Sequence, residues 1–174
     1  MTADERQSLF RQWLQEHKGL MFRVVRAYAA GRQQQEEELF QDILVQLWSS
    51  IPSFRGESSS STWVYRVALN TALAGQRADR KRRQRYRSLL EVHEPVDPGD
   101  SIATQQTDDM VEKLYAGIRQ LPEADRSLVL LHLDGLCYRE MADILGISES
   151  NVGVRLTRVR NKLADLLKGV GDEP

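Results

Sequence analysis

Apolar residues recur at helical spacing through most of the chain, and this pattern restricts the fold more than any other feature of the sequence. Within two segments of the first half the apolar positions lie four or seven residues apart: Leu9, Trp13, Leu20, Val24 and Tyr28, then Leu39, Ile43 and Leu47. Such spacing places the apolar side chains on one face of an α-helix. No segment alternates with a period of two for long enough to predict a strand. We therefore expect an all-α protein.

Short polar segments connect the predicted helices. The sequence "GRQQQEEELF" is expected to join the first two helices, and a third follows "SSSST" with Thr62 as its N-cap. Trp63 lies on the apolar side of that third helix, so packing is the expected role of its ring, and we expect Trp48 in the core as well. The second half reads as three or four helices, "DDMVEKLYAGIRQL", "PEADRSLVLLHLDG", "YREMADIL" and the segment after Gly146.

The charges are distributed unevenly, although the formal net charge is only −1. Residues 77–87 carry seven basic side chains and the single acid Asp79, whereas residues 88–112 carry acids and no Lys or Arg. After Asn151 the chain is basic again. A net charge near zero therefore conceals two basic segments of the kind that bind nucleic acid, separated by an acidic one.

The acidic segment is also the predicted boundary between two domains. It contains "EPVDPGD", whose Pro, Gly and Asp residues disfavour helix and strand alike. We interpret residues 88–108 as a flexible acidic linker between two small helical domains, residues 1–87 and residues 109–170.

Composition argues against several other classes of protein. The single cysteine, Cys137, excludes a disulfide framework and a cysteine-rich zinc site, and we expect it to be a small buried apolar residue. Three scattered histidines do not predict a catalytic metal cluster, and His17 is expected to be an ordinary helix residue. No apolar run approaches the roughly 18 residues of a membrane helix, and the first residues do not resemble a signal peptide. We expect a cytoplasmic protein without cofactor or metal.

Residues 138–163 have the pattern of a helix-turn-helix. The helix "YREMADIL" is followed by "GIS", in which Gly146 can adopt the left-handed conformation and Ser148 can cap the next helix. That next helix carries an apolar stripe of Val152, Leu156, Val159 and Leu163, and its opposite face is polar and basic. Two short helices joined in this way, the second with a polar free face, favour a reader of the DNA major groove.

Two motif sets together resemble a known family. The segment "LPEADRSLVLLHLDGLCYREMADILGISESNVGVRLTRVRNKL" resembles region 4 of bacterial sigma factors of the extracytoplasmic-function (ECF) group. In the N-terminal half, "EEELFQDILVQLW" resembles the core-binding helix of region 2, and "SFRGESSSSTWVYRVALNTAL" resembles the promoter-melting segment. The resemblance spans nearly the whole chain. It implies a sigma factor that binds core RNA polymerase, directs it to minus-10 and minus-35 promoter elements and promotes DNA melting.

The resemblance also implies a set of polymerase-binding residues. In the family, acidic and amide side chains of the region 2 helix dock on the clamp of the polymerase, and the matching residues here are Glu38, Gln41, Asp42 and Gln46. Their spacing places them on adjacent faces of one helix. The alternative is that these four residues form only the solvated face of an ordinary helix.

For the minus-10 element the family stabilises an unpaired strand, which requires a basic track and a pocket for extruded bases. The carried-over residues are Phe54, Arg55, Ser60, Arg66, Asn70 and Arg77. Phe54 and Arg55 would lie at the entrance of a pocket formed by "FRGESSSS", and the last three residues share one helix face. The family often carries an aromatic residue at the position of Ser60, so no stacking platform is expected there.

For the minus-35 element the resemblance implies contacts from the second helix of the helix-turn-helix, by Ser150, Asn151, Val154, Arg155 and Arg158. The family commonly places lysine and serine where Gly153 and Val154 stand. Glycine within a helix costs about 1 kcal/mol relative to alanine. Two explanations of Gly153 remain open: it permits a close approach of the backbone to DNA, or the position tolerates the defect.

The expected partners are core RNA polymerase, promoter DNA and an anti-sigma factor, and no membrane insertion or enzymatic activity is expected. One alternative is an activator or repressor that binds duplex DNA without polymerase, but this leaves the N-terminal motifs unexplained. Another is a metal-dependent nucleic-acid hydrolase that uses the acidic cluster Glu36, Glu37, Glu38 and Asp42. The sequence offers no further acids or histidines at ligand spacing for such an enzyme.

Overall fold

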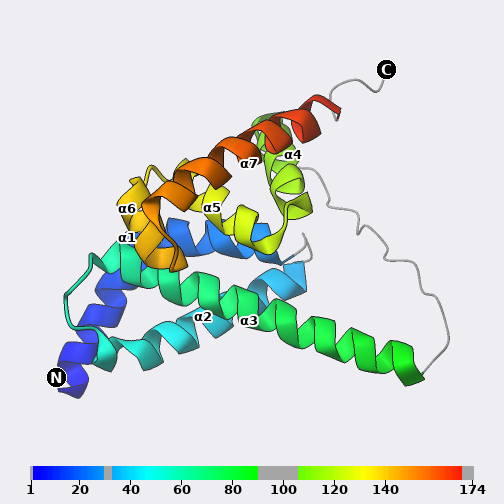
Figure 1. Cartoon of the computed structure of the whole chain (residues 1–174). Coiled ribbons are helices and arrows are strands. Elements are labelled where there is room, and N and C mark those ends of the chain that lie inside the picture. Colours follow the sequence, from blue (N-terminus) through cyan, green and yellow to red (C-terminus); the bar gives the residue numbers. More distant parts are fainter. Residues whose placement is uncertain (1, 30–32, 90–105, 170–174) are drawn as a thin grey trace.

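The computed structural model of the protein describes residues 2–29, 33–89 and 106–169. These residues form seven α-helices and one 3-10 helix, with no strand among them, which confirms the all-α prediction (Figure 1). In chain order the elements are α1 (Ala3–Tyr28), α2 (Gln33–Ser50), η1 (Ile51–Ser53), α3 (Ser60–Leu89), α4 (Gln106–Gln120), α5 (Glu123–Leu133), α6 (Tyr138–Leu145) and α7 (Glu149–Gly169).

Helices α1, α2 and α3 form an N-terminal unit around a shared core. Most of the predicted apolar stripe of α1 is buried, with Leu9 only partly so, and on α2 Ile43 and Leu47 are buried. Helix α3 contributes Val64, Tyr65 and Ala68 to the same core. Beyond this core the C-terminal end of α3 projects away from the other helices (Figure 1).

Helices α4 to α7 form a C-terminal unit. The stripe predicted on α7 is buried in full, and α7 packs against α4, α5 and α6. Gly117 of α4 lets α7 approach closely, because a Cβ atom at this glycine would lie only 3.1 Å from Leu163 Cδ1. The helix-turn-helix prediction is confirmed in its details: Gly146 ends α6 with a φ of 66°, and Ser148 Oγ accepts a hydrogen bond from the Asn151 backbone N–H at 3.3 Å.

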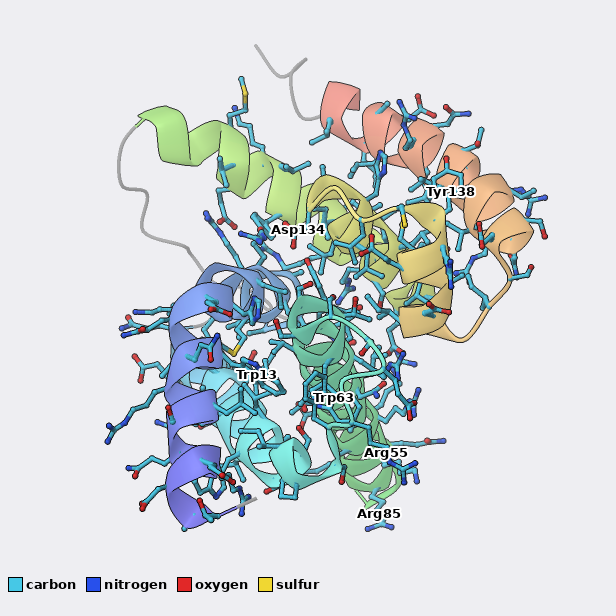
Figure 2. The ribbon with its side chains drawn as sticks, turned by 90° about the vertical axis from the view of Figure 1, so that its left-hand side faces the viewer. Trp13, Arg55, Trp63, Arg85, Asp134 and Tyr138 are labelled. Atoms are coloured by element: carbon cyan, nitrogen blue, oxygen red, sulfur yellow. The ribbon has the colours of Figure 1, made fainter. Side chains whose placement is uncertain are left out.

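The two units pack directly against each other, α4 and α5 on α1 and α6 on α3. Polar side chains form several contacts where they meet. The hydroxyl oxygen of Tyr28, at the end of α1, lies 2.6 Å from Ser127 Oγ of α5. Asp134, which follows α5, pairs with Arg23 Nε of α1 at 2.5 Å and accepts a hydrogen bond from Tyr65 of α3. Figure 2 shows Asp134 at this boundary.

Several boundaries differ from those predicted. Helix α2 begins at Gln33, so most of the expected connection "GRQQQEEELF" is helical. The polar residues of this segment form the first turns of α2. Thr62 is not the N-cap of α3: it is buried within the first turn, and Ser59 Oγ accepts the hydrogen bond from its backbone N–H. Of the predicted linker, residues 88–89 belong to α3 and 106–108 to α4. Residues 90–105 lie outside the described residues.

Candidate nucleic-acid interface

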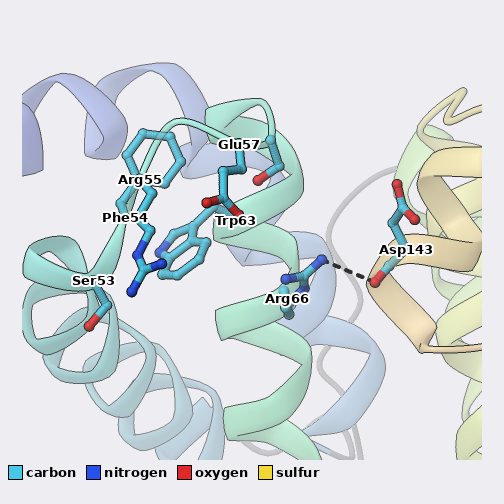
Figure 3. Close-up of a pocket in the computed structure, with 8 residues that line it drawn as sticks. Ser53, Phe54, Arg55, Glu57, Trp63, Arg66 and Asp143 are labelled. Carbon is cyan, nitrogen blue, oxygen red and sulfur yellow. Dashed lines mark hydrogen bonds between the residues drawn. The ribbon is translucent and has the colours of Figure 1, made fainter.

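A cavity of about 480 Å³ opens beside the loop that precedes α3 (Figure 3). Aromatic rings build one wall. The ring of Phe54 packs edge-on against Trp63 at a centroid distance of 5.4 Å and against Trp13 at 4.9 Å. Trp63 Nε1 donates to Ser50 Oγ at 3.1 Å, which fixes the indole, so the ring both packs against Phe54 and lines the cavity. The cavity is lined by Ser53, Phe54, Arg55, Glu57, Ser58, Trp63, Arg66 and Asp143.

Arg66 connects this cavity to the C-terminal unit. Its guanidinium donates to the backbone carbonyl of Asp143 in α6 at 3.0 Å, as Figure 3 shows. Its Nε–H group is buried and has no hydrogen-bond partner within the described part of the chain. A buried donor without a partner costs about 1–3 kcal/mol, so an acceptor that reached this group would recover that loss. The contribution of Asp143 has no signal in the sequence, because it depends on the packing of α6 against α3.

Ser60, the first residue of α3, does not line the cavity. Its hydroxyl oxygen lies 2.9 Å from His17 Nε2, so α1 holds the start of α3 in place. Burial lowers the pKa of His17 below its ordinary value of 6.5, although the neighbouring Glu16 acts in the opposite direction. His17 is therefore more than the ordinary helix residue expected from the sequence, because it positions the segment next to the cavity.

Two other candidates lie farther along α3. Asn70 and Arg77 are exposed beyond the cavity, on the helix that carries the basic segment. Among the basic residues described there, Arg80 pairs with Glu123 of α5 at 2.7 Å and Arg82 with Asp79 at 2.8 Å. The structure thus brings Phe54, Arg55 and Arg66 together at the cavity and leaves Asn70 and Arg77 as an extension along the helix.

Helix α2 presents the predicted polymerase contacts to solvent. All four of these residues, Glu38, Gln41, Asp42 and Gln46, are exposed. Between them stands Val45, with 60% of its surface exposed, and one turn later Trp48, with 36% exposed. The core placement expected for Trp48 is wrong, because its ring packs against Phe10 at the edge of the unit and the Arg6 guanidinium lies 4.1 Å above it. This surface is therefore polar with an apolar centre.

The predicted DNA-reading residues of α7 divide into two groups. Ser150, Asn151, Val154 and Arg158 are exposed on one side of the helix. Arg155 is half-buried, and its guanidinium donates to Asp125 of α5 at 2.8 Å. The geometry thus gives Arg155 a structural contact within the C-terminal unit.

Gly153 of α7 packs against the start of α6. A Cβ atom at Gly153 would lie 3.4 Å from Tyr138 Cε2, so the ring at the start of α6 covers this position. Tyr138 lies on the outer side of α6 beside α7 (Figure 2).

The preceding residue, Cys137, is exposed and caps α6, with its backbone N–H donating to Glu140 Oε2 at 2.9 Å. The prediction of a buried Cys137 is therefore wrong, since the cap position faces solvent.

Comparison with known proteins identifies the family to which these surfaces belong. Residues 13–85 match the model of Sigma-70 region 2, and residues 112–163 match that of Sigma-70, region 4. The chain is 30% identical over 139 residues to the ECF RNA polymerase sigma-E factor of Haemophilus influenzae. The aligned region covers 75% of this chain and 74% of that protein. The chain belongs to the ECF sigma factor family. The sigma-E factor of Escherichia coli strain K12 is 29% identical over 146 residues, with 75% of each chain covered.

Solved structures share the fold of this ECF sigma factor. The sigma factor RpoE of Bartonella quintana, in complex with the anti-sigma factor NepR, gives a TM-score of 0.63 at 23% identity over 91% of this chain and 98% of that one. CnrH, in complex with the cytosolic domain of CnrY, gives a TM-score of 0.65 at 20% identity, and the match covers 96% of this chain and 91% of that one. As a sigma factor, the protein acts in transcription initiation and directs RNA polymerase to promoters. None of its described helices is long and apolar enough to cross a membrane.

Proposed function

We propose that the ECF sigma factor divides its work between its two units. Residues 1–87 bind core polymerase and hold the melted minus-10 element, residues 88–108 link the units, and residues 109–170 bind the minus-35 element. The observation that carries the minus-10 assignment is the cavity beside α3, because it combines aromatic walls with the buried, unpaired Nε–H of Arg66. A flipped base offers both a flat ring and hydrogen-bond acceptors to such a site.

The proposed minus-10 residues follow one another from the loop before α3 into the helix itself. Phe54 and Arg55 flank the cavity, Arg66 donates to the base or phosphate that enters it, and Asn70 and Arg77 follow the strand along the helix. Ser60, through its contact with His17, holds the start of α3 in place beside the cavity. Arg66 also donates to the backbone carbonyl of Asp143, so this side chain joins the proposed minus-10 site to α6.

The exposed face of α2 is the proposed polymerase contact. Glu38, Gln41, Asp42 and Gln46 supply polar contacts, and Val45 supplies an apolar centre that the partner can desolvate. In protein–protein interfaces most of the binding energy comes from a desolvated centre that is surrounded by a polar rim.

The exposed face of α7 is the proposed minus-35 contact. Ser150, Asn151 and Val154 face the bases and Arg158 reaches a base or phosphate, while Arg155 supports the helix through Asp125. Each unit alone makes few contacts with DNA. Their attachment to polymerase makes the second DNA contact effectively intramolecular.

The remaining assignments follow from the same division of work. An anti-sigma factor is the proposed regulator, since one structural neighbour, RpoE, is in complex with the anti-sigma factor NepR. Another neighbour, CnrH, is in complex with the cytosolic domain of CnrY. Bond formation belongs to the polymerase, so the sigma factor itself has no enzymatic activity. The proposed compartment is the cytoplasm.

Reconstitution with core polymerase tests the proposal. The purified chain is bound to core, and the holoenzyme transcribes a pool of promoters with randomised upstream DNA. We expect core binding and enrichment of a shared motif in two blocks. If the chain binds a duplex operator tightly and does not bind core, the proposal is wrong.

Matched substitutions test the two surfaces of the N-terminal unit. Asp42→Lys should weaken core binding at least tenfold, whereas Glu36→Lys, the same charge change on the opposite side of α2 from Glu38, Gln41 and Asp42, should leave it unchanged. Arg66→Ala should reduce promoter opening with core binding intact, and Arg11→Ala, which removes an exposed arginine of α1 outside the basic segments, is its control. Equal effects of the two arginine substitutions on opening would contradict the role of the cavity.

A further inference from the structure

Helix α7 carries one exposed apolar side chain within its proposed DNA-reading face. Val154 has 54% of its surface exposed, although valine is usually buried. Ser150 and Arg158 lie one turn before and one turn after it, and both are exposed and polar. The two methyl groups of Val154 therefore project outward from the middle of a polar surface.

Gly153, the residue before Val154, has no side chain with which to read a base, and its position packs against α6. The ring of Tyr138 lies 3.4 Å from where a Cβ atom of residue 153 would stand, so this position packs against the start of α6. Residue 154 has no such cover. Of the two adjacent positions, 153 serves the contact between α6 and α7, and 154 faces the partner of the helix.

The chemistry of Val154 restricts what it can recognise. Valine has no hydrogen-bond donor or acceptor in its side chain, so it cannot discriminate bases through their nitrogen and oxygen atoms. In the major groove only thymine displays a methyl group, and apolar side chains contact it. We propose that Val154 recognises the C5-methyl group of a thymine in the minus-35 element. This proposal rests on the proposed role of α7 as the minus-35 reader.

Removal of single methyl groups from DNA tests the proposal. The holoenzyme is first used to select its promoter, and each thymine of the minus-35 block, on either strand, is then replaced by deoxyuridine. The measurement is competition binding of each duplex promoter to the holoenzyme at fixed salt. At one position we expect the affinity to fall about fourfold, which is the change that one buried methyl group produces.

Substitutions of the protein complete a thermodynamic cycle. Val154→Ala should weaken binding to the thymine promoter by a similar factor. This variant should then bind the deoxyuridine promoter and the thymine promoter with equal affinity. Val154→Thr, which keeps one methyl group and the shape of valine, provides a second variant and should retain part of the preference. Val111→Ala removes an exposed valine from α4 and is the control, with the full preference for thymine.

The outcomes separate this proposal from the one on which it depends. If transversions in the minus-35 block have no effect on binding, α7 does not read this element and the proposed function itself fails. If transversions weaken binding but deoxyuridine is tolerated at every thymine, the minus-35 role stands and methyl recognition by Val154 is overturned. A selected block without any A·T pair overturns it as well. A preference for thymine that persists in Val154→Ala assigns the methyl contact to another residue and also refutes the proposal.

Discussion

The contact between Tyr28 and Ser127 provides the sharpest test of how the two units of this sigma factor are joined. Tyr28 is 4% exposed and Ser127 is 1% exposed, and their hydroxyl oxygens lie 2.6 Å apart. The Tyr28 hydroxyl also donates to the backbone carbonyl of Glu123 at 3.1 Å. Burial raises the pKa of Tyr28 above its ordinary value of 10.0, as expected for a phenol removed from water.

Tyr28→Phe removes this hydroxyl group and changes little else. Ser127 keeps the Glu123 carbonyl as a partner, at 3.1 Å, so the variant does not leave it wholly unpaired. A buried hydrogen bond contributes about 1 kcal/mol net, and a partly unsatisfied partner adds to the loss. We expect the free energy of unfolding to fall by about 1–2 kcal/mol. In a double-mutant cycle with Ser127→Ala, the coupling energy should be about 1 kcal/mol.

Tryptophan fluorescence during urea denaturation measures this loss selectively. All three tryptophans, Trp13, Trp48 and Trp63, lie in the N-terminal unit. Ser127 lies in the C-terminal unit, so Ser127→Ala can shift the fluorescence transition only if the two units unfold together. Tyr138→Phe, which removes an exposed hydroxyl group, is the control and should leave the midpoint unchanged.

Two results would refute the reasoning. If Ser127→Ala leaves the tryptophan transition where it was, the C-terminal unit does not stabilise the N-terminal one through this interface. If the effects of Tyr28→Phe and Ser127→Ala are simply additive, the two hydroxyl groups are not in contact in solution.

Three further predictions concern single positions. Gly153→Ala should raise the free energy of unfolding by up to about 1 kcal/mol, because alanine favours the helix and its Cβ would make only ordinary contact at 3.4 Å; a lower thermal midpoint would contradict this. Burial acts to raise the pKa of Glu112, but hydrogen bonds from Arg119 and Arg26 outweigh it and hold the pKa below 4.5. The ionised carboxylate thus stabilises the fold above pH 4.5, and this contribution is lost as the pH falls through the lowered pKa. Glu112→Gln should therefore make the free energy of unfolding depend less on pH below 4.5. Burial lowers the pKa of His17 below 6.5, so its contribution to stability is present above pH 6.5 and is lost as the pH falls through the lowered pKa. Unfolding midpoints of the wild type and His17→Gln between pH 7.5 and 5 should converge toward the acidic end, and parallel profiles would show that His17 does not titrate in this way.

Periodicity predicted the helices well because burial of one face is a local property of the sequence. The stripe of α7 and the glycine that ends α6 depend on residues within two or three turns of each other, and both were predicted correctly. Helix boundaries were harder to predict. Ser59 and Thr62 are both competent caps, and only the path of the chain into α3 decides between them.

The candidate site was predictable in full only where a single element supplies it; at the cavity, Phe54, Arg55 and Arg66 were expected but Asp143 was not. The exposed face of α2 and that of α7 each follow from one helix, whereas the cavity takes residues from the loop before α3, from α3 itself and from α6. Trp48 and Cys137 were assigned to the interior on residue type. Their exposure depends on where α2 meets the edge of its unit and on the cap of α6.

The sequence by itself determined that this protein is helical, that it has two motif-bearing halves, and which helix faces are polar. These properties follow from spacing along the chain, where neighbours in sequence are neighbours on a helix. Only the tertiary structure decided that Arg66 meets Asp143, that His17 holds Ser60 and that Tyr28 meets Ser127. Each of these contacts joins residues at least 43 positions apart. Such pairs form because packing of the apolar faces brings their helices together, and no local pattern records which polar side chains will meet there.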